Sequence, residues 1–146
     1  MIVTFIALIW LLFCAWQDWK KRSVSNWLTI PAIVVAVGLR VWLDYSLYGS
    51  VPLYLLGMSA LIVAAAGIGY LAKLMGGADA KVVIALAIVS PILAIWAWIG
   101  AILWWLMLRV YALIRKDKDK LPPLPGMLGF VAGTFAYLLF TALTLQ

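Results

Sequence analysis

Two aspartates, Asp18 and Asp79, are the side chains of this sequence best placed to do chemistry. Each lies where a long apolar stretch meets polar residues: Asp18 precedes "WKKR", and Asp79 follows two glycines in "GGADAK" (76–81). Two facing carboxylates hold one proton between them, because like charges a few ångströms apart cannot both ionise readily. The ionised member can take a proton from water while the protonated member polarises a peptide carbonyl. The two residues therefore indicate aspartyl-protease chemistry.

The rest of the composition excludes several other chemistries. The chain has no histidine and one cysteine, Cys14, which rules out a Ser-His triad and a His-ligated zinc site. Cys14 lies in an apolar run and is interpreted as a packing thiol. Of the other aspartates, Asp44 is expected in a short outer loop, while Asp117 and Asp119 alternate with lysines in a solvated loop. We therefore expect no metal ion and no cofactor.

The residues around Asp79 fit a catalytic role. Gly76, Gly77 and Ala78 have little or no side chain, so an extended substrate backbone could approach the carboxylate closely. A helix that begins here would favour the ionised aspartate through its dipole, and Lys81 would add positive potential. The alternative interpretation is a glycine-rich turn followed by an aspartate that caps a helix.

The composition identifies an integral membrane protein. Of the 146 residues, 68% are hydrophobic and only 11% are charged. In a soluble domain about half of the residues are hydrophobic and about a quarter are charged. The net charge of +6 does not indicate nucleic-acid binding, because the basic residues gather at the ends of apolar stretches, as in membrane proteins. We expect the lipid bilayer as a partner and no nucleic acid.

The apolar stretches predict an all-α membrane protein, a polytopic bundle of about six helices. A helix needs about 20 apolar residues to cross the hydrocarbon core. The predicted helices cover residues 2–16, 27–43, 52–72, 79–89, a stretch from about 91 to 114, and 126–145. Residues 82–114 are too long for one crossing, and Ser90-Pro91 offers the break because proline removes a backbone donor. The fourth helix is then short and does not span fully.

The positive-inside rule supports this count. With residues 20–22 in the cytoplasm, two crossings between residues 82 and 114 return "RKDKDK" (115–120) to the same side. Both termini are then outside. Arg40 and Arg109 are expected to extend toward the headgroups, and the tryptophans to form belts at the two interfaces.

Three segments together resemble the type IV prepilin peptidase family of membrane aspartyl peptidases. "DWKKRSVSNW" (18–27) resembles the family's segment of an aspartate, basic residues and "IPN". "GGADAK" is similar to its "GxGD" motif, and "LPPLPGMLGFVAG" (121–133) to the proline-rich approach to its last helix. The order and the six hydrophobic segments also agree, so the resemblance covers nearly the whole chain.

The resemblance implies a function and a set of residues. Asp18 and Asp79 match the two catalytic aspartates, and the supporting positions are Asn26, Gly76, Gly77, Ala78 and Lys81. Two positions depart from the family pattern: Ser25 replaces a proline, and Ala78 replaces the second glycine of "GxGD". The implied substrates are pilin-like or flagellin-like precursors, cut at the cytoplasmic face of the cell membrane between a short basic leader and a hydrophobic helix.

The sequence lacks the paired "CxxC" motifs that accompany N-methylation in larger family members. We therefore expect a single transmembrane peptidase domain (1–146), without a separate soluble or methyltransferase domain, similar to archaeal preflagellin and prepilin peptidases or the bacterial tight-adherence type. Two alternatives remain open. One is a "GxGD" intramembrane protease of the presenilin kind, although Asp18 lies at a helix edge rather than in its middle. The other is a small membrane transporter or a non-catalytic scaffold.

Overall fold

The computed structural model describes residues 2–50, 52–114 and 126–144, and these ranges form six helices. They are α1 (Ile2–Lys21), α2 (Asn26–Tyr48), α3 (Leu53–Leu71), α4 (Gly77–Val89), α5 (Pro91–Ile114) and α6 (Met127–Thr144). Five of them are long and apolar enough to cross a membrane, and α4 is the exception. The predicted all-helical bundle with a short fourth helix is confirmed. The loop of Asp117 and Asp119 lies outside the described residues.

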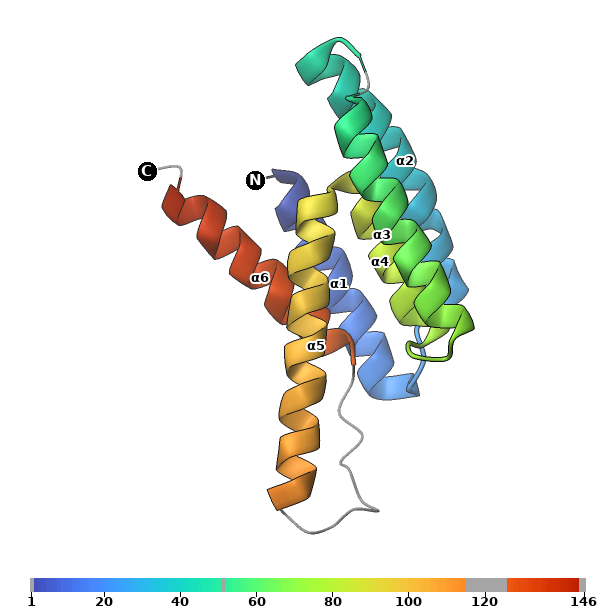
Figure 1. Ribbon diagram of the computed structural model, residues 1–146, viewed down its shortest axis with the longest axis vertical. Helices are drawn as coiled ribbons and strands as arrows, with labels where there is room; N and C mark the ends of the chain where they lie inside the picture. The colour runs from blue at the N-terminus through green and yellow to red at the C-terminus, as the bar shows by residue number, and fades with distance from the viewer. Residues whose placement is uncertain (1, 51, 115–125, 145–146) are drawn as a thin grey trace. The chain divides into compact units, whose positions relative to one another are not determined.

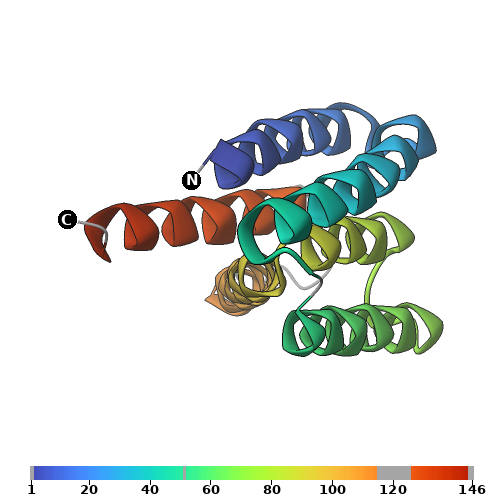
Figure 2. The same ribbon diagram turned by 90° about the horizontal axis from the view of Figure 1, so that it is seen from above.

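The chain divides into two compact units. Unit 1 comprises the described parts of 1–24 and 96–146, in which α1 packs against α6 and α6 also contacts α5 (Figure 1). Unit 2 comprises the described parts of 25–95, and here α4 packs against both α2 and α3. Seen from above, α4 lies between these two helices (Figure 2). The single-domain organisation stays a prediction.

Helix α4 is an interior helix. It has only 13 residues, and its buried positions face every direction around the axis: Ala80, Val82, Val83, Ala85, Leu86 and Ala87. A helix that is apolar all round is stable only when neighbours cover it on several sides. Its position between α2 and α3 therefore follows from its composition, and it carries Asp79 in its first turn.

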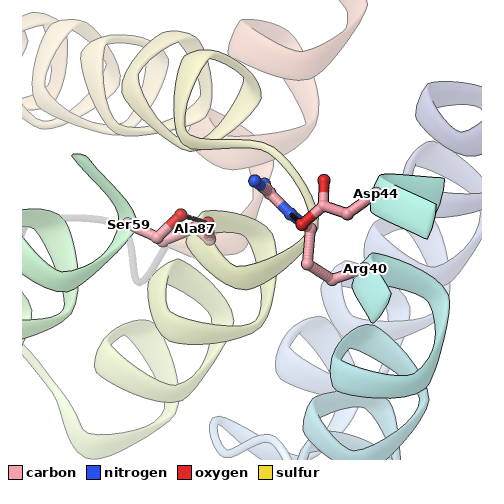
Figure 3. Close-up of polar contacts among 4 residues, drawn as sticks. All are labelled: Arg40, Asp44, Ser59 and Ala87. Atoms are coloured by element: carbon pink, nitrogen blue, oxygen red, sulfur yellow. Dashed lines mark hydrogen bonds and ion pairs between the residues drawn. The ribbon is translucent and has the colours of Figure 1, made fainter. Parts of the chain in front are cut away.

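The predicted break at Ser90-Pro91 is confirmed, because α4 ends at Val89 and α5 begins at Pro91. Pro91 has no N–H, so the Ala87 carbonyl four residues earlier lacks its helical donor. The Ser59 hydroxyl on α3 donates to this carbonyl at 2.7 Å (Figure 3). On the other side of the break, Ser90 Oγ accepts the Leu93 N–H at 3.3 Å and caps α5. The polar groups exposed by the break thus find partners within the protein.

Two helices are longer than the sequence predicts. Helix α1 continues past Trp16 to Lys21, so Asp18 lies inside it rather than after it. Helix α2 continues past Leu43 to Tyr48 and ends at Gly49, whose φ of +67° suits glycine. Polar residues end an apolar stretch but need not end a helix: glutamine and lysine, which extend α1, are good helix formers, and α2 continues until Gly49.

The extension of α2 changes the environment of Arg40 and Asp44. Asp44 was expected in an outer loop, but it lies on α2 with only 4% of its side chain exposed. Arg40 was expected to reach the headgroups, but its Nε donates to Asp44 Oδ2 at 2.6 Å (Figure 3). The two residues are one helical turn apart, so they meet on the same face. The loop expected for Asp44 was wrong, because α2 continues through it. The extension of Arg40 toward the headgroups stays a prediction.

Small residues bring α5 and α6 together in unit 1. Gly129 and Gly133 are one turn apart on α6, and a Cβ on either would collide with the backbone of α5. Gly100 on α5 is equally tight against Gly133. This is the small-residue packing typical of membrane helices. Trp96, expected in an outer aromatic belt, stacks on Phe140 of α6 with ring centroids 5.6 Å apart.

Candidate active site

Asp18 lies in the last turn of α1, half-buried, and contacts the start of α6. Its Oδ2 accepts the backbone N–H of Met127, the first residue of α6, at 3.4 Å. The first N–H groups of a helix have no partner within the helix and carry partial positive charge, so they favour a carboxylate. Within unit 1 the structure therefore brings Asp18, from the segment 18–27, to Met127, from the segment 121–133.

Asp79 lies in the first turn of α4, in unit 2, and is also half-buried. A Cβ on Gly76 would lie 3.2 Å from Asp79 Oδ2, so the carboxylate leans over this glycine. A Cβ on Gly77 would lie 3.2 Å from a ring carbon of Tyr70. A side chain at either glycine would therefore require its neighbour, Asp79 or Tyr70, to shift by a few tenths of an ångström. Ala78, which replaces the second glycine of the motif, is accommodated as a helical residue.

Asn26 and Lys81 meet in unit 2. Lys81 Nζ on α4 donates to Asn26 Oδ1, at the first residue of α2, at 2.5 Å. The sequence predicted both as supporting positions but did not predict that they touch. The contact therefore joins the end of the segment 18–27 to "GGADAK" (76–81).

The structure thus connects the predicted residues in two groups. Asp18 contacts Met127 in unit 1, and Asn26 contacts Lys81 close to Asp79 in unit 2. The facing of the two aspartates stays a prediction. In the part of the chain that the structure describes, no three His, Cys, Asp or Glu side chains gather as a metal site requires. Carboxylates at two helix starts can accept protons and bind a water, which suits acid–base chemistry.

Comparison with known proteins gives one match. A family model described as the type IV leader peptidase family matches residues 5–141. The chain belongs to this family. Comparisons with curated proteins and with solved structures gave no match.

Membership in the type IV leader peptidase family implies a peptidase. It therefore favours an enzyme over the transporter and scaffold alternatives. Five helices able to cross a membrane fit a multi-pass membrane member of this family. The matched range includes all seven residues predicted for the site, from Asp18 to Lys81.

Sequence reasoning about this chain missed one residue beside the candidate site, Met127. Its contribution is a backbone N–H, which every residue except proline carries, so its side chain gives no signal. The signal available was its position, directly after a proline-rich stretch and Gly126, where a helix starts. The resemblance of residues 121–133 to the family's last motif pointed to the segment without assigning it a role.

Proposed function

We propose that the protein is an aspartyl endopeptidase that removes the short basic leader from pilin-like or flagellin-like precursors. Asp18 and Asp79 would act as the catalytic pair, at the cytoplasmic face of the cell membrane. The observation that carries the proposal is the family match across both aspartates, together with their similar surroundings. Each is half-buried at the N-terminal end of a helix, Asp18 at α6 and Asp79 at α4.

The reaction needs one proton shared by the two carboxyl groups. The ionised aspartate takes a proton from a water as the water oxygen attacks the carbonyl carbon of the scissile peptide. The protonated aspartate gives its proton to the carbonyl oxygen, which yields a neutral tetrahedral diol. When the C–N bond breaks, the protonated aspartate gives its proton to the leaving nitrogen and the ionised aspartate takes a proton from one hydroxyl of the diol. The products are a carboxylic acid and an amine, and the pair again holds one proton. Because each group gives and takes a proton in turn, neither has a fixed role.

The position of the site suits such a substrate. Asp18 lies within a turn of the basic residues 20–22, and Asp79 lies between Lys73 and Lys81. By the positive-inside rule these residues mark the cytoplasmic side. A bond between a basic leader and a hydrophobic helix would lie at the same depth, so the substrate helix could remain in the bilayer during cleavage.

The test is cleavage of purified precursors in detergent, followed by the mass of the product. Asp18→Asn and Asp79→Asn keep the shape of each side chain, and an asparagine at position 18 still offers an oxygen to Met127. We expect both to lose cleavage entirely and to keep the helical circular dichroism of the wild type. Asp117→Asn removes a carboxylate from the polar segment and serves as the matched control. Cleavage that persists in either site variant would refute the catalytic pair.

A further inference from the structure

The hydrogen bond between Lys81 and Asn26 joins two helices that start 51 positions apart in the chain, at Asn26 and Gly77. Lys81 Nζ is the donor and Asn26 Oδ1 the acceptor. Asn26 is exposed and Lys81 is half-buried, so the contact lies at the rim of the α2–α4 packing rather than in its core. Asp79 lies in the first turn of α4, two residues before Lys81.

The stability of the α2–α4 packing does not explain this pair. Helices α2 and α4 pack against each other, and each has fully buried residues, among them Thr29 on α2 and Val82 and Val83 on α4. An exposed hydrogen bond adds little, and it restricts a long lysine side chain. The ammonium also ends beside the first residue of α2, where the helix dipole disfavours a cation. The pair therefore contributes little to the stability of the packing.

The pair is well placed to fix the orientation of Asp79. The first turn of α4 begins with Gly77 and follows Gly76, and glycine backbones have wide conformational freedom. Residues two apart on a helix point to different sides, so Lys81 can hold α2 without occupying the space of the Asp79 carboxylate. A lysine anchored at Asn26 sets both the rotation of this turn and its height against α2.

We propose that Asn26 and Lys81 form a positioning pair, which holds the first turn of α4 so that Asp79 has the geometry needed for cleavage. This inference rests on the proposed function. It assigns to both residues an action through Asp79 rather than contact with the substrate. Since misplacement of a reacting group by about 1 Å can cost roughly 100-fold in rate, a modest surface contact can have a large catalytic effect.

A double-mutant cycle tests the pair in the full-length protein with the cleaved precursor. Asn26→Ala and Lys81→Met should each lower kcat by about tenfold to 100-fold with KM nearly unchanged. The double variant should fall no further than the single variants, because either change breaks the same contact. Lys81→Arg keeps a cationic donor and should recover part of the loss. Lys73→Met removes the same charge from the exposed turn before α4 and should leave kcat unchanged.

Three results would overturn the inference. Losses that multiply in the double variant would show that the residues act independently. A silent Asn26→Ala beside a damaged Lys81→Met would show that Lys81 acts on the substrate directly. A rise in KM alone would assign both residues to substrate binding.

A second measurement does not depend on activity. The Ala80 N–H donates to Gly76 O at 3.0 Å and closes the first turn of α4, so its hydrogen exchange reports on that turn. Exchange should be faster in Asn26→Ala than in the wild type, with the amides of α3 unchanged. Unchanged exchange at Ala80 would refute the positioning pair. If the wild type cleaves no precursor, the proposed function fails, and this exchange result still decides whether the pair holds the turn.

Discussion

Replacing Gly133 by alanine tests how closely α5 and α6 must approach each other. A Cβ at this position would overlap Trp96 O and lie 2.8 Å from Ala97 Cα, both on the backbone of α5. Backbone atoms cannot rotate out of the way as a side chain can. Carbon atoms need about 3.5–4.0 Å, so the two helices must separate by about 1 Å at this crossing.

The magnitude follows from two opposing effects. Alanine in a helix is favoured over glycine by about 0.5–1 kcal/mol. Overpacking a tight contact costs about 1–3 kcal/mol, and a rigid backbone neighbour places Gly133 toward the upper part of that range. We therefore expect Gly133→Ala to lower the free energy of unfolding by about 1–2 kcal/mol. Gly38→Ala is the matched control, because a Cβ at Gly38 would meet no atom within 4 Å.

The assay is unfolding in mixed detergent micelles by increasing fractions of sodium dodecyl sulfate, followed by circular dichroism. Gly38→Ala should be as stable as the wild type or slightly more stable. Gly133→Ala should also lower the cleavage rate, because a shift of α6 moves the Met127 N–H away from Asp18. A Gly133→Ala variant as stable as Gly38→Ala would refute the argument that the α5–α6 contact excludes a side chain.

Three further predictions concern polar contacts. The Met127→Pro variant should cleave the precursor about tenfold to 100-fold more slowly than Met127→Ala, because proline fits the first position of a helix but removes the N–H that Asp18 accepts. Equal cleavage rates would show that this N–H is unimportant. Asp44→Ala should lower the free energy of unfolding by about 3–5 kcal/mol, because Arg40 loses its counterion in a largely buried position. The double variant Arg40→Met/Asp44→Leu removes both charges, so its free energy of unfolding should fall much less. Ser59→Ala should cost about 1–3 kcal/mol in the same titration, because the carbonyl at the helix break loses its donor, and wild-type stability would contradict this account.

Local sequence signals were sufficient for the helices and for the break within residues 82–114. The fourth helix was predicted at 79–89 and occupies Gly77–Val89. This succeeded because proline removes a backbone donor and serine caps the next helix, which are effects of adjacent residues. The same kind of reasoning placed the ends of α1 and α2 too early, since it took charged residues for helix ends.

The candidate site was predictable as a set of residues but not as a set of contacts. Asp18, Asp79, Asn26 and Lys81 were all named from motifs, because carboxylates and glycines at helix boundaries are visible in the order of residues. The hydrogen bond between Asn26 and Lys81 was not predicted. It depends on how α2 and α4 pack, which is a property of two helices rather than of either segment.

The sequence by itself determined that this chain is a helical membrane protein with two motif aspartates, because apolar length and local helix breaks depend only on neighbouring residues. The tertiary structure alone decided which polar groups from distant segments meet. It brought the Met127 N–H to Asp18 and the Lys81 ammonium to Asn26. The physical reason is that hydrogen bonds act over a few ångströms, so they form between distant segments only where packing brings these close together.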